Sequence, residues 1–322
     1  MAHAADVSVA TVSRVINDAP SVTVRTRDKV QAVIQRLGFA PNPMARALTT
    51  GRTRTIAALV PTLNHSIFAR FLTAMEAGLT ANGMSLVVAT TNGDPDIELA
   101  KAKNLLKLGS DGFILTGVQH SDALFDLVEG RATPVILTSW FDKRARHPTI
   151  GYDNRAIAAR AAAHLGALGH RRIAVIHGSL TNNDRTVARL DGVRACGADI
   201  DVSPVEAPLS VTGGAAAAAR ALALSPRPTA LLCLSDVLAL GALFEVQRRG
   251  LSSPEDISLM GFDDLEWAEA ANPPLSSIRL PAAEMGYECA DALHRYFAFG
   301  EPVAPRELHA ELAIRGSVSA PR

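Results

Sequence analysis

Residues 8–17 carry polar side chains whose types and spacing suit contact with nucleic acid. Ser8 is expected to be the N-cap of a helix, and hydroxyl, guanidinium and amide groups recur on one face of that helix at Thr11, Ser13, Arg14 and Asn17. Small hydroxyls can reach phosphate oxygens, and the planar guanidinium can bridge O6 and N7 of a guanine. Apolar residues at helical spacing are expected to form the opposite face, at Val9, Val12, Val15 and Ile16. Taken alone, these residues also fit an ordinary amphipathic surface helix.

A second group of polar residues follows the ends of predicted strands. Arg189 near the start of a helix and Asp263 after a strand are expected to contact a ligand. Guanidinium, carboxylate and hydroxyl groups beside an aromatic ring suit a polyol or a sugar acid. Asp236 and Asp264 are expected to cap helices. The other polar residues at these ends are His65, Asp153, Asn154, Arg185 and Ser235.

Short apolar strands alternate with amphipathic helices from Thr55 onward. Strands are expected at 56–61, 86–90, 112–116, 135–139, 173–177, 230–234, 257–261 and 277–280. Helices are expected near 67–82, 96–108, 154–168, 186–196, 213–224, 237–249 and 282–298. This alternation predicts parallel sheets covered on both faces, in two doubly wound subdomains whose ligands bind at the carboxyl ends of strands.

Two further helices are predicted before Thr55. One spans 23–37, with Thr23 as its N-cap and Gly38 as its C-cap. The other begins at Asn42 and Pro43 and ends at Gly51. The second helix is too short to be stable alone, so it should form only when a partner orders it.

Charge and composition exclude several classes of protein. Residues 1–54 hold eight Lys or Arg against three Asp, a net charge of +5, so the remainder carries −5 because the whole chain is neutral. A basic module on an acidic body favours a polyanion partner for that module alone. We find no signal peptide and no apolar run of the roughly 18 residues that a membrane span needs. The three Cys lack ligand-like spacing, so we expect a soluble cytoplasmic protein with buried free thiols.

The sequence carries no signature of the common enzyme classes. P-loop, GxSxG, HExxH and CxxC motifs are absent, and the nine His residues do not cluster. The adjacent side chains of Asp263 and Asp264 would point apart, so a metal or acid–base pair is not expected there. We therefore expect no catalysis, no metal and no cofactor.

The N-terminal motif resembles the recognition helix of the lactose-repressor (LacI/GalR) family of bacterial transcription factors. The family fingerprint is close to V-S-x-x-T-V-S-R-x-x-N, which residues 7–17 match. Three further segments resemble family signatures: L-G-H-x-x-I at 168–173, R-x-x-G at 189–192 and G-[FY]-D-[DN] at 261–264. The resemblance covers essentially the whole chain.

The resemblance implies an α/β protein with three parts. A helix-turn-helix (lambda-repressor-like) module would occupy residues 1–40, and a hinge helix with its linker would occupy 41–54. Residues 55–322 would form an effector-binding and dimerisation domain of the periplasmic-binding-protein-like type I, with two doubly wound parallel-sheet subdomains. The first subdomain would comprise 55–152 and 281–305, and the second 153–280 and 306–322.

The resemblance also implies which residues contact DNA and effector. By the resemblance Leu48 of the hinge helix would wedge between base pairs. Val9 and Ala10 are small, so they should favour apolar contact with a thymine methyl or simply tolerate close approach. Ser235 stands where many relatives have asparagine, so a shorter hydrogen-bonding group is expected there. The DNA-binding set is Ser8, Val9, Ala10, Thr11, Ser13, Arg14, Asn17, Thr26, Asn42, Ala45, Arg46 and Leu48. The effector-binding set is Ile67, Phe68, Asp153, Arg189, Ser235 and Asp263.

By this resemblance the protein is a regulator, most simply a repressor, of a carbohydrate or sugar-acid operon. A homodimer or a tetramer would bind a palindromic operator, and an effector in the cleft would change the operator affinity. The alternative is a sugar receptor of the same fold without DNA function, which would lack the basic module. Residues 1–6 leave the first helix barely one turn, with Asp6 in place of the usual turn glycine. Either the true start codon lies upstream or the module is defective, and we expect the first because the recognition and hinge motifs are intact.

Overall fold

The computed structural model describes residues 1–16, 21–38 and 52–322. They belong to two compact units, Met1–Thr53 and Arg54–Arg322. Asn17 and the expected hinge helix lie outside the described residues, so their assignments remain predictions. These assignments concern Asn17, Asn42, Ala45, Arg46 and Leu48.

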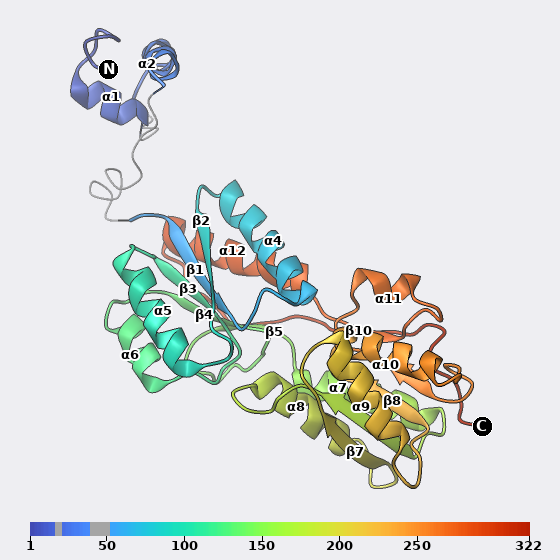
Figure 1. Ribbon diagram of the computed structural model, residues 1–322. Coiled ribbons are helices and arrows are strands. Elements are labelled where there is room, and N and C mark those ends of the chain that lie inside the picture. The colour runs from blue at the N-terminus through green and yellow to red at the C-terminus, as the bar shows by residue number, and fades with distance from the viewer. Residues whose placement is uncertain (17–20, 39–51) are drawn as a thin grey trace. The chain divides into compact units, whose positions relative to one another are not determined.

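In the N-terminal unit, the helices α1 (Val9–Ile16) and α2 (Val24–Arg36) begin where the predicted caps place them (Figure 1). The hydroxyl of Ser8 accepts the N–H of Thr11 at 3.1 Å. The hydroxyl of Thr23 accepts the N–H of Thr26 at 3.4 Å. Such bonds satisfy donors that a helix start leaves open. The buried faces of the two helices meet in a small core of Ala5, Val12, Val15, Val30 and Val33.

Two details of this unit differ from the predictions. Val9 is 76% exposed instead of buried, because α1 begins at Val9 and turns Val12 and Val15 toward the core. Residues 2–6 form turns instead of the end of a helix. Asp6 adopts a φ of 47°, the left-handed conformation expected of a residue that replaces a turn glycine.

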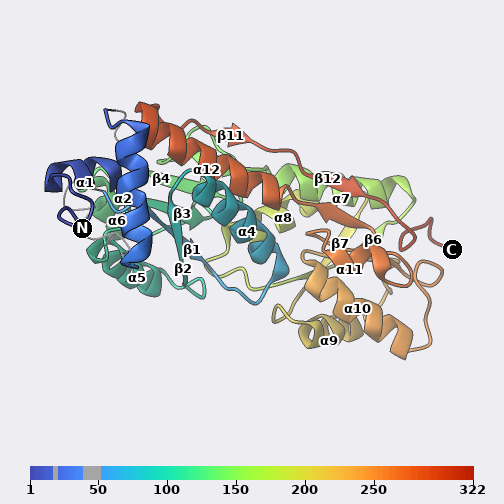
Figure 2. The same cartoon turned by 90° about the horizontal axis from the view of Figure 1, so that it is seen from above.

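The first subdomain of the C-terminal unit is a parallel sheet in the order β11-β5-β4-β3-β1-β2. Helices α4 (Ser66–Ala81) and α12 (Ala282–Phe299) pack side by side on one face (Figure 2). Helices α5 (Pro95–Lys107) and α6 (Asp122–Glu129) cover the other face. The strands are β1 (Thr55–Val60), β2 (Ser85–Thr90), β3 (Gly112–Thr116), β4 (Val135–Thr138), β5 (Thr149–Gly151) and β11 (Arg306–Glu307).

The second subdomain repeats this design with a parallel sheet in the order β7-β6-β8-β9. Helices α7 (Asn154–Ala167) and α8 (Asp184–Arg194) cover one face, and α9 (Val211–Leu222) and α10 (Asp236–Arg248) cover the other. The strands are β6 (Arg172–His177), β7 (Asp201–Glu206), β8 (Ala230–Cys233) and β9 (Ser258–Met260). The short helix α11 (Glu266–Ala270) and an antiparallel pair, β10 (Ser277–Arg279) with β12 (Glu311–Ala313), complete it. Both subdomains are therefore the α/β layers that the sequence predicts.

Three segments of the chain cross between the two subdomains, near 151–153, 280–281 and 308–310. Arg306 and Glu307, expected in the second subdomain, pair with β5 of the first sheet instead. Leu308 still packs in the first core, whereas Ala310 packs in the second. The third crossing therefore lies a few residues later than expected, because backbone pairing with β5 holds the chain in the first subdomain.

Close packing of α9 against α10 depends on glycine. A Cβ at Gly241 would lie 2.0 Å from the carbonyl oxygen of Val211 and 2.7 Å from the nitrogen of Ala215. Gly214 meets α10 in the same way, because its Cβ would lie 2.3 Å from the carbonyl oxygen of Leu238. The two backbones therefore touch without intervening side chains. The Ala-rich helix α9 is therefore packed directly against its neighbour.

We expect Gly241→Val to lower the free energy of unfolding by about 1–3 kcal/mol, because the added methyl groups must separate α9 from α10. Urea denaturation followed by circular dichroism measures this change. Gly197→Ala is the matched control, since a Cβ at Gly197 meets nothing within 4 Å. Equal stability of Gly241→Val and the wild type would contradict the packing described here.

Candidate ligand cleft and nucleic-acid interface

The carboxyl ends of the two sheets flank a cleft of about 870 Å³, which includes space open to solvent. Ile67 and Phe68 line it from α4, and Arg189 lines it from α8. Ser235 and Asp263 line it from the segments after β8 and β9. The fold thus brings five of the six predicted effector-binding residues to one cavity. Further apolar side chains complete its wall: Phe71, Leu209, Leu280 and Met285.

Arg189 is 8% exposed, and neutral acceptors surround its guanidinium. Nε donates to Oδ1 of Asn154 at 2.8 Å, Nη1 to the carbonyl oxygen of Leu234 at 3.1 Å, and Nη2 to the hydroxyl of Tyr152 at 3.3 Å. The guanidinium carbon lies 3.8 Å from the centroid of the Phe262 ring, a cation–π contact. A guanidinium has five N–H donors, so these three bonds leave two donors for a ligand.

Asp263 faces the same cavity, and its Oδ2 accepts the hydroxyl of Ser235 at 3.1 Å. Burial raises the pKa of Asp263 to about 7; the carboxylate of Asp236 adds to this rise and Arg189 opposes it. Its φ of 125° is a strained backbone conformation that aims the carboxyl group. When ionised, Asp263 can accept from a ligand hydroxyl, and when protonated it can donate to a ligand oxygen.

Asp236 holds the segment after β9 in place instead of capping α10. It is fully buried, and it accepts the hydroxyl of Ser277 at 2.6 Å and the N–H of Leu265 at 2.7 Å. Burial raises the pKa of Asp236 to about 6, although these two hydrogen bonds lower it. The helix-cap prediction for Asp236 is therefore wrong, because its acceptors serve groups outside α10.

Asp264 likewise caps no helix. Its carboxylate pairs with Nε of Arg279 at 2.8 Å and with Nη1 of Arg315 at 2.7 Å. Burial alone would raise the pKa of Asp264, but the hydrogen bonds and charges of the two guanidiniums lower it. The prediction failed because both partners come from remote parts of the chain, at β10 and just after β12.

The structure places Asp153 outside the cleft. Asp153 is exposed and is the N-cap of α7, where its carboxylate accepts the N–H of Ala156 at 2.9 Å. Its neighbours face the cleft side instead. Tyr152 lines the cavity, and Asn154 holds Arg189 while it donates to the carbonyl oxygen of Ser139 at 2.8 Å. Because Asp153 occupies the N-cap position of α7, its side chain points away from the ligand cleft.

Sequence reasoning assigned no ligand contact to several other residues that line the cleft. Arg185 and His65 were identified only as polar residues at element ends, and Tyr152 and Met285 were given no role. The position of Tyr152 beside Asp153 was the available signal for it, whereas an apolar residue such as Met285 on a helix predicts core packing. Burial lowers the pKa of His65 and raises that of Tyr152, which favours the neutral form of both side chains.

The predicted DNA-contacting residues of α1 lie at the surface of the N-terminal unit. Four side chains of the set are exposed on or beside α1 in addition to Val9: Ser8, Ala10, Ser13 and Arg14. Thr11 is half-buried, and its hydroxyl lies 2.9 Å from that of Ser8. Thr26 on α2 is also half-buried. A short helix with small exposed residues fits the width of the major groove.

The described ranges contain neither a metal-binding cluster nor a membrane-spanning helix. No group of three or more His, Cys, Asp or Glu there could hold a metal ion. Within the same ranges, no helix is long and apolar enough to cross a membrane. Cys233 and Cys289 are buried free thiols as expected, and burial raises the pKa of each. Cys196 is also a free thiol, but it is only partly buried, which differs from the prediction.

Comparisons with known proteins agree with this architecture. The family model described as bacterial regulatory proteins, lacI family, matches residues 1–42, and that of a periplasmic binding protein-like domain matches residues 162–318. The chain is 34% identical over 296 residues to the ribose operon repressor of Haemophilus influenzae, covering 89% of this chain and 87% of the relative. It is 31% identical over 323 residues to the HTH-type transcriptional repressor CytR of Escherichia coli, covering 98% and 94%. Its fold is similar to that of the lac repressor dimer bound to operator and the anti-inducer ONPF, with a TM-score of 0.87, 25% identity and coverage of 99% and 98%.

We expect the gain in stability from Asp263→Asn to grow as the pH rises. The pKa of Asp263 is about 7 in the folded protein, against about 4 in an unfolded chain. Between these values the folded state keeps a proton that the unfolded state has lost, so the wild type loses stability as the pH rises. Asparagine does not titrate and avoids this loss. Urea denaturation at about pH 5 and about pH 8 measures the difference in free energy of unfolding between the variant and the wild type. A difference that is the same at both pH values would contradict the raised pKa of Asp263.

Proposed function

The chain belongs to the lacI family of bacterial regulatory proteins, and on that premise we propose that it represses a carbohydrate or sugar-acid operon under effector control. One observation carries the proposal: the chain combines an exposed helix bearing the family motif with a cleft that gathers Arg189, Ser235 and Asp263. Such a helix suits DNA, and the donors and acceptors of the cleft suit a hydroxylated ligand.

In this proposal α1 reads the operator from the major groove. Arg14 contacts a guanine, and Val9 and Ala10 lie against a thymine methyl. The small hydroxyls of Ser8 and Ser13 contact phosphates. Two copies of the chain, as a homodimer or within a tetramer, read the two halves of a palindrome; the structurally similar lac repressor is a dimer bound to operator. The expected hinge helix with Leu48 enters the minor groove.

The proposed effector binds in the cleft without being converted. A change in the orientation of the two subdomains then alters operator affinity, because each ligand biases the same conformational equilibrium. A sugar is the favoured class because a relative is named a ribose operon repressor and because the cleft offers both donors and acceptors. The protein acts in the cytoplasm, on the nucleoid when it is bound to its operator.

We expect Arg14→Ala to weaken binding to the preferred operator by about 1–3 kcal/mol and to relax the preference for guanine at one position of each half-site. The operator is selected in vitro from random duplexes, and fluorescence anisotropy measures the affinities. Arg36→Ala, on the last turn of α2, is the control and should keep the base preference. An equal loss on every duplex after Arg14→Ala would reassign this residue to phosphate contact.

Asp263→Ala and Arg189→Ala should each leave operator binding in place and abolish its response to effector. A thermal-shift screen of sugars, sugar acids and phosphorylated sugars identifies the effector, since a ligand at 100 times its Kd adds about 2.7 kcal/mol of stability. Asp153→Ala is the control: it removes a carboxylate that lies outside the cleft, so operator binding by this variant should still respond to effector. A normal response in either cleft variant would show that the residue is structural.

A further inference from the structure

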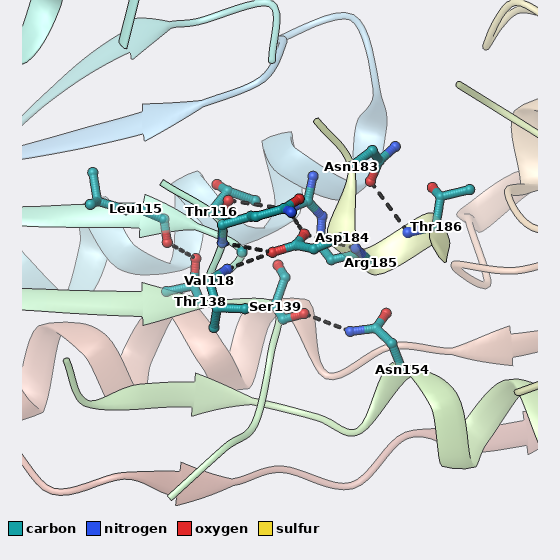
Figure 3. Close-up of polar contacts among 12 residues, drawn as sticks. Leu115, Thr116, Val118, Thr138, Ser139, Asn154, Asn183, Asp184, Arg185 and Thr186 are labelled. Carbon is teal, nitrogen blue, oxygen red and sulfur yellow. Dashed lines mark hydrogen bonds and ion pairs between the residues drawn. The ribbon is translucent and has the colours of Figure 1, made fainter. Parts of the chain in front are cut away.

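A loop of the first subdomain is bonded to the first turn of α8 in the second subdomain. Oδ2 of Asp184 accepts the N–H of Val118 at 2.6 Å and the N–H of Gln119 at 3.0 Å (Figure 3). The side chain of Asp184 is 10% exposed, so water has little access to these bonds. Hydrogen bonds to an ionised carboxylate are about twice as strong as bonds between neutral groups.

Arg185 extends this contact. Its Nη1 donates to the carbonyl oxygen of Thr116 at 3.1 Å and to Oδ1 of Asp184 at 2.8 Å (Figure 3). Burial lowers the pKa of Arg185, and the carboxylate of Asp184 opposes that shift, so each charge supports the other. Arg185 also lines the ligand cleft, one helical turn before Arg189.

Gly117 makes the close approach possible. It adopts a φ of 93°, and a Cβ there would lie 2.4 Å from Nη1 of Arg185 and 2.6 Å from Oδ2 of Asp184. A side chain at this position would push α8 away from the loop. The loop at 116–119 and the start of α8 therefore match in shape as well as in charge.

We propose that Asp184 and Arg185 form a clasp that sets how far the cleft closes in the free protein. The clasp consists of the chain's own atoms, so it can act without a ligand. It joins two segments that do not belong to the three crossings at 151–153, 280–281 and 308–310, so it is a further link between the subdomains. Because Arg189 follows Arg185 on the same helix, the clasp also positions the Arg189 guanidinium relative to the first subdomain. Asp184 is thus a positioning residue for the ligand cleft.

Another hydrogen bond between the subdomains has a neutral acceptor and is therefore weaker than the charged contacts of the clasp. Nη1 of Arg70 on α4 donates to the carbonyl oxygen of Asp264 at 2.9 Å. This acceptor is neutral, whereas the clasp combines an ionised carboxylate, an ion pair and two backbone donors. Loss of the Asp184 carboxylate should therefore shift the equilibrium toward an open cleft.

Double electron–electron resonance measures the distance between two spin labels and tests the clasp in the full chain, with neither DNA nor effector present. The labels occupy Lys103→Cys in the first subdomain and Glu255→Cys in the second, both exposed positions, in a Cys196→Ser background. We expect Asp184→Ala to shift the distance distribution to longer values. The N–H groups of Val118 and Gln119 should then exchange with deuterium at least about tenfold faster.

Gly117→Ala places a Cβ on the first-subdomain side of the clasp, where it would clash with Asp184 and Arg185, so it should also lengthen the distances. It is the second variant if Asp184→Ala fails to fold. Two controls should keep the wild-type distribution. Asp191→Ala removes an exposed carboxylate from the same helix. Gly169→Ala adds a side chain at a similar φ of 103°, where its Cβ would meet Pro321 at 3.5 Å.

Wild-type distances in Asp184→Ala and Gly117→Ala would overturn the proposal, even with faster exchange. A merely local bond would free the two N–H groups without moving the subdomains. The experiment contains no operator and no effector, so it is independent of the proposed function. Failure of the wild type to bind any operator would remove that function and leave the clasp standing.

Discussion

The buried guanidinium of Arg189 is the charge around which one side of the cleft is built. A buried charge is costly unless hydrogen-bonding partners replace water. Here the partners are Tyr152 just before α7, Asn154 at its start and Leu234 just after β8. The ring of Phe262 lies against the guanidinium. Asn154 in turn donates to Ser139, which follows β4, so the network extends into the first subdomain. The first crossing is thereby held by the same group that is offered to a ligand.

The segment 261–264 gives two adjacent carboxyl groups different tasks. Asp263 and Asp264 have positive φ values of 125° and 51°, which turn one carboxyl toward the cavity and the other toward Arg279 and Arg315. Gly261 is required beside them, because a Cβ there would lie 2.1 Å from Oδ1 of Asp236. The ion pairs of Asp264 tie this turn to β10, which adjoins the crossing at 280–281, and to the segment after β12. Ligand contact and interdomain geometry therefore share one turn.

Sequence reasoning succeeded where a local pattern decides the structure, and failed where distant contacts do. Most buried parallel strands were predicted because they are apolar runs, but the three-residue strand β5 was missed although it is buried. The strand β7 was missed because it is a polar edge strand that contains a proline. Arg189 and Asp263 lie in recognisable motifs. Asp153 was misplaced because the exact N-cap of α7 decides which neighbouring side chain turns inward. The clasp could not be predicted, since the Asp184 carboxylate bonds to backbone groups 65 and 66 residues away that only the fold brings near.

The two subdomains hold their apolar cores separately, and this separation decides what kind of motion the cleft can make. The first core lies between its sheet and α4 with α12, and the second lies between its sheet and α7 with α8; Ile67 packs against both. The clasp and the Arg70 bond, by contrast, are polar contacts between the subdomains. Polar groups exchange protein partners for water at small net cost, whereas apolar surface does not. The subdomains can therefore part without exposing either core, and a ligand needs only a modest preference for one arrangement to shift the balance.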